Sequence, residues 1–211
     1  MMFLRVSLSL AVTACASLVA FADKDAAIQP SIATTGTASI SESFDSPLSE
    51  LIRVAKGDWK SSNGVLTGKE VASDHHAAVL MLQKPNRNSV VRFSFKLDGM
   101  TNGFHFSLNH RRGHLFRVVV SPSKLAIHLD KDKKDPKSKV LVLDSDEANF
   151  AQDTWYTMQV EMVGDRVAVQ TDNGAKVEAS NPKLDTDKPN YRFVTRGDSL
   201  SIDDLKVWEA N

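Results

Sequence analysis

The sequence contains a single cysteine, Cys15, in 211 residues. This cysteine lies inside an uncharged apolar stretch, VSLSLAVTACASLVAFA, which directly follows Arg5. A basic residue, a short apolar segment and a small-x-small end at residues 20–22 are typical of a secretory signal peptide, which we expect over residues 1–22. Removal of that segment would leave a mature chain without cysteine, which excludes disulfides, thiol catalysis and thiolate zinc sites.

Two features bear on how this segment is processed. The residues before Cys15, Val-Thr-Ala, resemble a lipoprotein processing site, so anchoring at Cys15 is an alternative. However, the apolar run continues to Ala22, which favours cleavage there and a secreted or periplasmic mature protein. The run is also shorter than the roughly 20 apolar residues that a spanning helix needs. We therefore expect no transmembrane segment in the mature chain.

The sequence lacks an excess of either charge, with 26 basic and 26 acidic residues. This balance gives no electrostatic basis for a nucleic-acid partner. Residues 23–41 are small and polar without periodicity, which predicts a flexible leader. Residues 42–211 are long enough to bury one core, so we expect one folded domain there. Nothing in the pattern indicates a cofactor or defines an oligomeric state.

Helical periodicity is almost absent; only residues 47–56 (PLSELIRVAK) predict a short helix. Elsewhere apolar and polar residues alternate, as in VVRFSFKL (residues 90–97), FHFSL (residues 104–108) and MQVEM (residues 158–162). Turn signals such as Asn63-Gly64 separate these runs. Strands with one apolar and one polar side predict an all-β, two-sheet antiparallel jelly-roll sandwich.

Several short motifs resemble the concanavalin A-like lectin/glucanase superfamily, and most closely the domain family named for 3-keto-disaccharide hydrolases. They cover most of residues 42–209 and comprise GDWKSSNGVL (57–66), VVRFSFKLDG (90–99), NGF (102–104), WY (155–156), GD (164–165) and IDDLKVW (202–208). The resemblance implies a jelly-roll fold and a carbohydrate or glycoside as partner. Members of that family place a strand with glutamate and glutamine after the Asn-Gly-Phe strand. This chain has HLFRV (residues 114–118) instead.

Candidate site residues come from the polar sides of the predicted strands. A conventional glucanase needs two carboxylates facing one bond, and no Glu-x-Asp-x-Glu pattern occurs. Cleavage of a 3-keto glycoside by elimination would instead use a base and a group that stabilises an enolate. We predict His105 as base, with Arg117 and Lys96 stabilising the oxygen. If the polar faces form one surface, four further ligand-binding residues are predicted: Arg92, Ser94, Ser107 and Asn109.

Two clusters could suggest a metal but do not predict one. The spacing of His105, His110 and His114 fits no helical zinc motif, and two arginines lie between the second and third histidines. The loop LDKDKKDPKSK (residues 129–139) has three aspartates, but it lacks the central glycine and the twelfth-position glutamate of a helix-loop-helix calcium site. We predict no metal site.

The interpretation we favour is a secreted carbohydrate-recognising β-sandwich, a non-catalytic or degenerate member of the 3-keto-disaccharide hydrolase-like family. One alternative is an active hydrolase or lyase acting on 3-keto glycosides. Another is a structural cell-envelope protein without a small ligand. A concave pocket containing His105, Arg117 and Lys96 would favour the enzyme, and an open groove with an exposed aromatic side chain would favour binding. A flat, convex or helix-covered face would favour the structural role.

Overall fold

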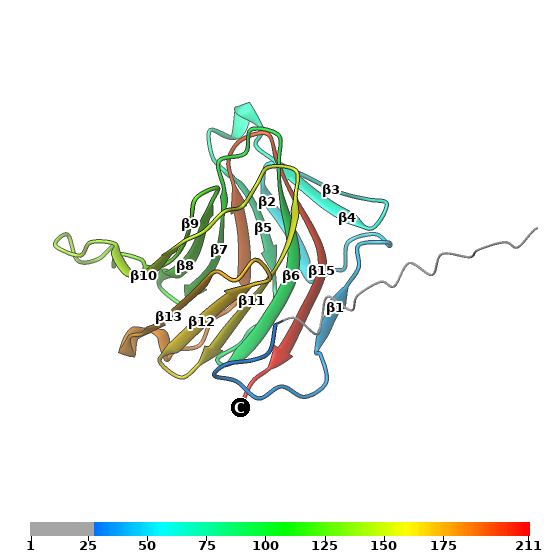
Figure 1. Cartoon of the computed structure of the whole chain (residues 1–211). Coiled ribbons are helices and arrows are strands. Elements are labelled where there is room, and N and C mark those ends of the chain that lie inside the picture. Colours follow the sequence, from blue (N-terminus) through cyan, green and yellow to red (C-terminus); the bar gives the residue numbers. More distant parts are fainter. Residues whose placement is uncertain (1–27) are drawn as a thin grey trace, which may run out of the picture.

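The computed structural model describes residues 28–211, which form two antiparallel β-sheets stacked on each other (Figure 1). The predicted jelly-roll sandwich is confirmed. The predicted signal peptide and Cys15 lie outside the described residues. Within residues 28–211, helical structure consists of two 3-10 turns, η2 (Ala72–Asp74) and η3 (Pro182–Leu184). Neither of these turns approaches the length of a membrane-spanning helix.

The eight-stranded sheet runs, in spatial order, through β13 (Lys176–Ser180), β12 (Arg166–Thr171), β11 (Trp155–Val163), β6 (Ser89–Asp98), β15 (Ser199–Glu209), β4 (Val65–Lys69) and β3 (Asp58–Ser62), with β1 (Ile40–Glu42) also paired to β15. The seven-stranded sheet runs through β10 (Leu141–Glu147), β9 (Lys124–Leu129), β8 (Gly113–Ser121), β7 (Phe104–His110), β14 (Tyr191–Thr195), β5 (Ala78–Leu82) and β2 (Ile52–Lys56). Consecutive strands β6 and β7 therefore belong to different sheets.

Aromatic side chains join the two sheets at their centre. Phe93 of β6 lies 5.0 Å from Phe193 of β14 in an edge-to-face arrangement, and Phe95 lies 4.9 Å from Phe104 of β7, measured between ring centroids. All four rings are buried, as is Phe106. The burial of each such side chain contributes about 1.5–3 kcal/mol to folding. The predicted inward face of the alternating runs is confirmed.

The predicted hairpin at Asn63-Gly64 joins β3 to β4. Both residues have positive φ, 52° and 75°, the conformation of the tight turn that suits two twisted antiparallel strands. Across this hairpin, Trp59 packs flat against Gly68. A Cβ atom at Gly68 would lie 2.3 Å from the indole ring, so only glycine leaves room for the tryptophan.

The short helix predicted over residues 47–56 is wrong. Residues 52–56 form the edge strand β2, in which Ile52 pairs with Leu82 and Val54 pairs with Leu80. Helix propensity is a weak preference that tertiary contacts override, and these β-branched side chains suit a strand. The adjacent residues 49–52 form a turn instead of a helical start, with the Ile52 amide donating to the Ser49 carbonyl at 2.8 Å.

The flexible leader predicted over residues 23–41 also differs from the structure for residues 28–41. Residues 40–42 form β1 on the eight-stranded sheet. Upstream, the backbone amides of Ser31, Ile32 and Ala33 donate to the fully buried carboxylate of Glu161, at 2.9, 2.8 and 3.1 Å. Successive amides of this kind form a concave site for an anion. Residues 28–33 therefore lie across the outer face of the eight-stranded sheet.

Candidate functional site

The seven predicted site residues lie on two opposite faces of the molecule. Arg92, Ser94 and Lys96 alternate with inward phenylalanines on β6, so they face outward from the eight-stranded sheet. The remaining four residues, on β7 and β8, face outward from the seven-stranded sheet. The whole core separates the two groups. The expectation that one surface carries all seven residues is wrong, because β6 and β7 belong to different sheets.

The cations of β6 make contacts within their own face. The Arg92 guanidinium donates to the Gln159 side-chain oxygen at 2.7 Å and to the Ile28 carbonyl at 2.8 Å. The Lys96 ammonium lies 5.6 Å from the centre of the Trp155 ring. Arg92 thus helps to hold the N-terminal segment. Lys96 is too far away to act with His105 and Arg117.

The seven-stranded sheet brings the other predicted residues together. Its register places Arg192 of β14 opposite Ser107 of β7, Ser107 opposite Arg117 of β8, and Arg117 opposite His128 of β9. Neighbouring strands lie about 4.8 Å apart, so these four side chains form one continuous polar row. His105 lies two residues before Ser107 on β7, so its side chain is next to this row on the same face of the sheet.

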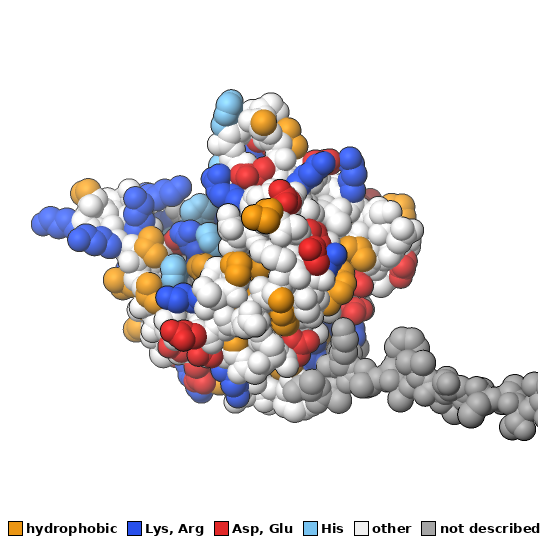
Figure 2. Space-filling view, turned by 45° about the horizontal axis from the view of Figure 1, so that its top comes forward, with side chains coloured by type: hydrophobic (Ala, Val, Ile, Leu, Met, Phe, Trp, Pro, Cys, Tyr) orange, Lys and Arg blue, Asp and Glu red, His pale blue; other side chains and the backbone are white. Residues whose placement is uncertain are grey.

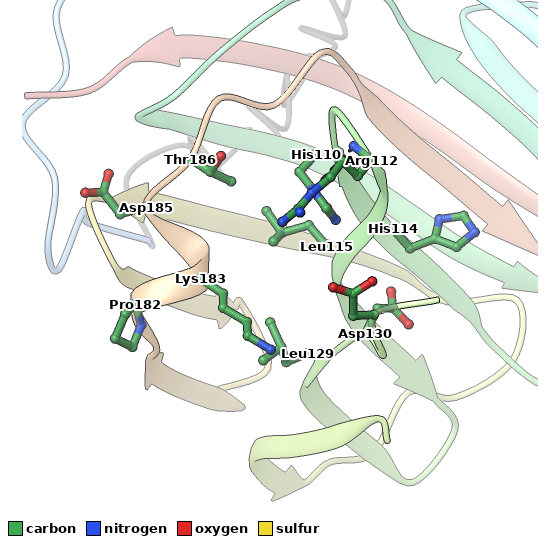
Figure 3. Close-up of a pocket in the computed structure, with 11 residues that line it drawn as sticks. His110, Arg112, His114, Leu115, Leu129, Asp130, Pro182, Lys183, Asp185 and Thr186 are labelled. Carbon is green, nitrogen blue, oxygen red and sulfur yellow. Dashed lines mark hydrogen bonds between the residues drawn. The ribbon is translucent and has the colours of Figure 1, made fainter. Parts of the chain in front are cut away.

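Three residues of this row, Ser107, Arg117 and Arg192, line a surface groove together with His105. Its central cavity, of about 240 Å³, is lined by His76, Ala77, His105, Ser107, His114, Arg117, Asp130, Arg192, Val194 and Arg196. A side cavity of about 250 Å³ shares His114 and Asp130 with it and continues toward η3, whose Pro182 and Lys183 appear in Figure 3. Figure 2 shows histidine and basic side chains close together in a hollow of the surface. We call the two cavities together the groove.

An ion pair organises the centre of the groove. Arg117 donates to the carboxylate of Asp130, whose side chain is 6% exposed. Burial lowers the pKa of Arg117 from its ordinary value, although the guanidinium stays protonated at neutral pH. Asp130 is the only carboxylate among the described residues that line the central cavity, and this arginine already engages it.

Three histidines on this face of the sheet, His105, His114 and His128, are held in their neutral form. Burial, with a smaller contribution from Arg117, lowers the pKa of His105 from 6.5 to about 4. Burial and the nearby Arg192 likewise lower the pKa of His114 to about 4. Burial also lowers the pKa of His128. At neutral pH these imidazoles can each donate and accept one hydrogen bond, and they add no positive charge.

Arg192 is the principal groove residue that the sequence analysis did not predict. Its Nη1 atom lies 2.8 Å from Nδ1 of His114 and 3.4 Å from the side-chain oxygen of Asn109. The predicted ligand-binding residue Asn109 therefore orients its neighbours at one end of the row. The pattern YRFVT (residues 191–195) does alternate, so it could have indicated an outward arginine. However, the non-local pairing of β14 with β7 is not visible in the sequence.

Ser107 has an unusual environment for a polar residue. It is only 6% exposed, and its hydroxyl has no hydrogen-bond partner among residues 28–211. Leaving a buried hydroxyl unpaired costs about 1–3 kcal/mol. Because Ser107 lies between Arg117 and Arg192 in the lining of the cavity, a bound ligand in the groove could supply the missing partner.

The described residues contain no cluster of three histidine, aspartate, glutamate or cysteine side chains that could hold a metal ion. The aspartates of the loop after β9 have other partners. Asp130 pairs with Arg117, and Asp132 accepts from the Lys134 amide at 2.9 Å.

No protein-family model matches the sequence, and no curated protein matches it. Among solved structures, the chain is similar to carbohydrate binding module CBM66 from Bacillus subtilis, with a TM-score of 0.59 and 9% identity, covering 75% of this chain and 96% of that chain. It is also similar to SCLam, a non-specific endo-beta-1,3(4)-glucanase of family GH16, with a TM-score of 0.59 and 12% identity, covering 85% and 95%. These proteins share its fold.

A third similar structure is LamA from Zobellia galactanivorans in complex with laminaritriose and laminaritetraose. Its TM-score is 0.58 at 11% identity, and the match covers 83% of this chain and all of that chain. At such low identities the similarity concerns the arrangement of strands and not the residues of the groove.

Proposed function

We propose that this chain is a secreted carbohydrate-recognising β-sandwich that binds a glycoside in the groove of the seven-stranded sheet. The observation that carries the proposal is the buried, unpartnered hydroxyl of Ser107 between Arg117 and Arg192. Sugar hydroxyls both donate and accept hydrogen bonds, so they match a surface of arginines, neutral histidines and a serine. The fold neighbours include a carbohydrate binding module and a glucanase, which supports the same class of ligand.

We further propose that the chain is a non-catalytic or degenerate relative of the 3-keto-disaccharide hydrolase-like domains. The predicted catalytic set of His105, Arg117 and Lys96 is divided between two faces. A glycosidase of the two-carboxylate type needs two available carboxylates at one bond. Of the three aspartates that line the groove, Asp130 and Asp185 are paired with arginines, and only Asp132 has no ion pair within residues 28–211. Binding without bond cleavage needs neither a base with its two cationic partners nor a pair of carboxylates at one bond.

The alternative is an active hydrolase or lyase on 3-keto glycosides, and the presence of His105 and Arg117 in one cavity favours it. Neutral His105 could take the proton next to the ketone while Arg117 stabilises the enolate oxygen and the glycosidic oxygen leaves. A pKa of about 4 makes His105 a weak base, and efficient proton transfer requires a pKa closer to the working pH. We therefore rank binding ahead of catalysis.

A glycan array followed by calorimetry tests the binding proposal. The full chain is screened against neutral and acidic oligosaccharides, and the affinity for the best ligand is then measured for wild type, Ser107→Ala and Ser94→Ala. Ser94 is the matched control because it is an outward serine on the opposite sheet. We expect the first variant to bind about two- to tenfold more weakly, as for one lost hydrogen bond, and the control to match wild type.

Absence of binding to every glycan would overturn the proposal and favour a structural cell-envelope role. Equal weakening by both serine variants would place the ligand elsewhere. A turnover assay with a 3-keto-disaccharide, using wild type and His105→Ala, separates the enzyme from the binding module. Turnover that is lost in the variant would establish the alternative.

A further inference from the structure

Arg192 differs from the other arginines of the groove in its partners. Arg117 is paired with Asp130, and Arg196 lies 3.1 Å from the carboxylate of Glu70. No carboxylate among residues 28–211 forms an ion pair with Arg192, whose Nη1 atom contacts only His114 and Asn109. Its remaining donors, Nε and Nη2, have no hydrogen-bond partner in the same part of the chain.

This unpaired charge is also partly removed from water. Arg192 is half-buried, and burial followed by the nearby Arg117 lowers its pKa from the ordinary value. A buried charge without a counter-ion destabilises a fold unless a partner compensates it. The guanidinium offers two parallel donors, a geometry that suits the two oxygens of a carboxylate or a similar oxyanion.

Two of the three acidic residues that line the groove form ion pairs with arginines. Asp130 pairs with Arg117, and Asp185, at the far end of the side cavity, pairs with Arg87 at 2.9 Å. Asp132 accepts a backbone amide. Basic side chains also line the groove on both sides of Arg192, with Arg196 in the central cavity and Arg112 and Lys183 in the side cavity. The groove lining contains five basic and three acidic side chains, so its net charge is positive.

We propose that the saccharide held in the groove is acidic, and that Arg192 receives its oxyanion, a uronate carboxylate or a sulfate ester. This inference rests on the proposed function, because it names the class of sugar that the same site takes. Ser107 lies opposite Arg192 in the strand register and donates its free hydroxyl to the same group or to a neighbouring sugar oxygen. Arg117, on the next strand, stays with Asp130.

The test compares three tetrasaccharides of matched length by calorimetry with the full chain: a uronate oligomer, a sulfated neutral oligomer and laminaritetraose. Wild type, Arg192→Gln, Arg192→Lys and Arg166→Gln are measured. Arg166 is the charge-matched control, because it lies on β12 of the opposite sheet and pairs with exposed Glu178. Circular dichroism and thermal unfolding establish that each variant is folded.

We expect the wild type to bind one of the two acidic oligomers at least about tenfold more tightly than laminaritetraose, with an affinity that falls as salt rises. The affinity of Arg192→Gln for that oligomer should be about tenfold to a hundredfold weaker than the wild-type affinity. Arg192→Lys should be weakened less, and Arg166→Gln should bind as tightly as wild type. The preferred oligomer distinguishes carboxylate from sulfate.

Two results would overturn the inference while leaving the proposed function intact. One is tighter binding of laminaritetraose than of both acidic oligomers, with Ser107→Ala still weakening it. The other is an acidic preference that Arg192→Gln does not change in a folded protein. If none of the three oligomers nor any array glycan binds, the proposed function itself fails.

Discussion

Replacement of Glu161 by glutamine should detach the N-terminal segment from the sandwich. The carboxylate accepts three backbone amides from residues 31–33, and the Gln159 side chain donates to it at 3.0 Å. A hydrogen bond to a charged group contributes about 1.5–3 kcal/mol, and glutamine retains one acceptor oxygen while turning an NH2 group toward the donors. We expect a loss of about 3 kcal/mol, equivalent to a fall in Tm of about 6–12 °C.

Thermal unfolding together with amide hydrogen exchange measures this effect. The amides of residues 31–33 should exchange slowly in wild type and quickly in Glu161→Gln. If the segment detaches as a unit, the loss in the free energy of unfolding cannot exceed the free energy with which the segment binds the sheet. The reason is that the side chain at position 161 forms hydrogen bonds with water once the segment has left. The matched control is Glu178→Gln, an exposed glutamate on the same sheet, for which we expect a change within about 0.5 kcal/mol. Unchanged exchange at residues 31–33 in Glu161→Gln would refute the reasoning.

Two further predictions concern acid stability and packing. Since the pKa values of His105 and His114 fall from 6.5 to about 4 on folding, the unfolded chain takes up protons first as the pH drops. The free energy of unfolding should therefore decrease as the pH falls from 6.5 to about 4. It should decrease less steeply in the double variant His105→Gln/His114→Gln, and urea titrations at several pH values measure this difference. Gly68→Ala should lower the free energy of unfolding by about 1–3 kcal/mol because the added methyl group meets the Trp59 ring. The control Gly36→Ala, whose methyl group enters open space, should not lower it. Equal urea midpoints for the two variants would contradict this prediction.

Alternation in the sequence predicts the faces of single strands reliably. Phe104 and Phe106 point inward while His105 and Ser107 point outward, because every second side chain in a strand leaves the same side. This regularity is local, so it needs no knowledge of which strands are neighbours. This alternation is sufficient to predict the fold class and the outward side chains of β7 and β8 that line the groove.

The pairing of distant strands is not encoded in such local patterns. The turn at residues 99–103 looks like a hairpin, yet it carries the chain from one sheet to the other, which separates Lys96 from His105. Arg192 reaches Ser107 only because β14, more than eighty residues further along, inserts beside β7. Predicting either fact requires the order of strands, and that order results from packing of the whole core.

The N-terminal segment also looks featureless without its partner. Residues 23–41 are mostly small and polar and show no apolar periodicity, which made flexibility the natural expectation. What orders them is one buried carboxylate on a strand about 130 residues away. A single glutamate in an otherwise apolar and neutral strand was the available signal.

The docked segment and the groove occupy opposite outer faces of the sandwich. Ile28, the first residue that the structure describes, therefore lies on the face away from the groove. If that end were fixed to a surface, the groove would still face open solvent. A long polymer could then lie across it without meeting the attachment point.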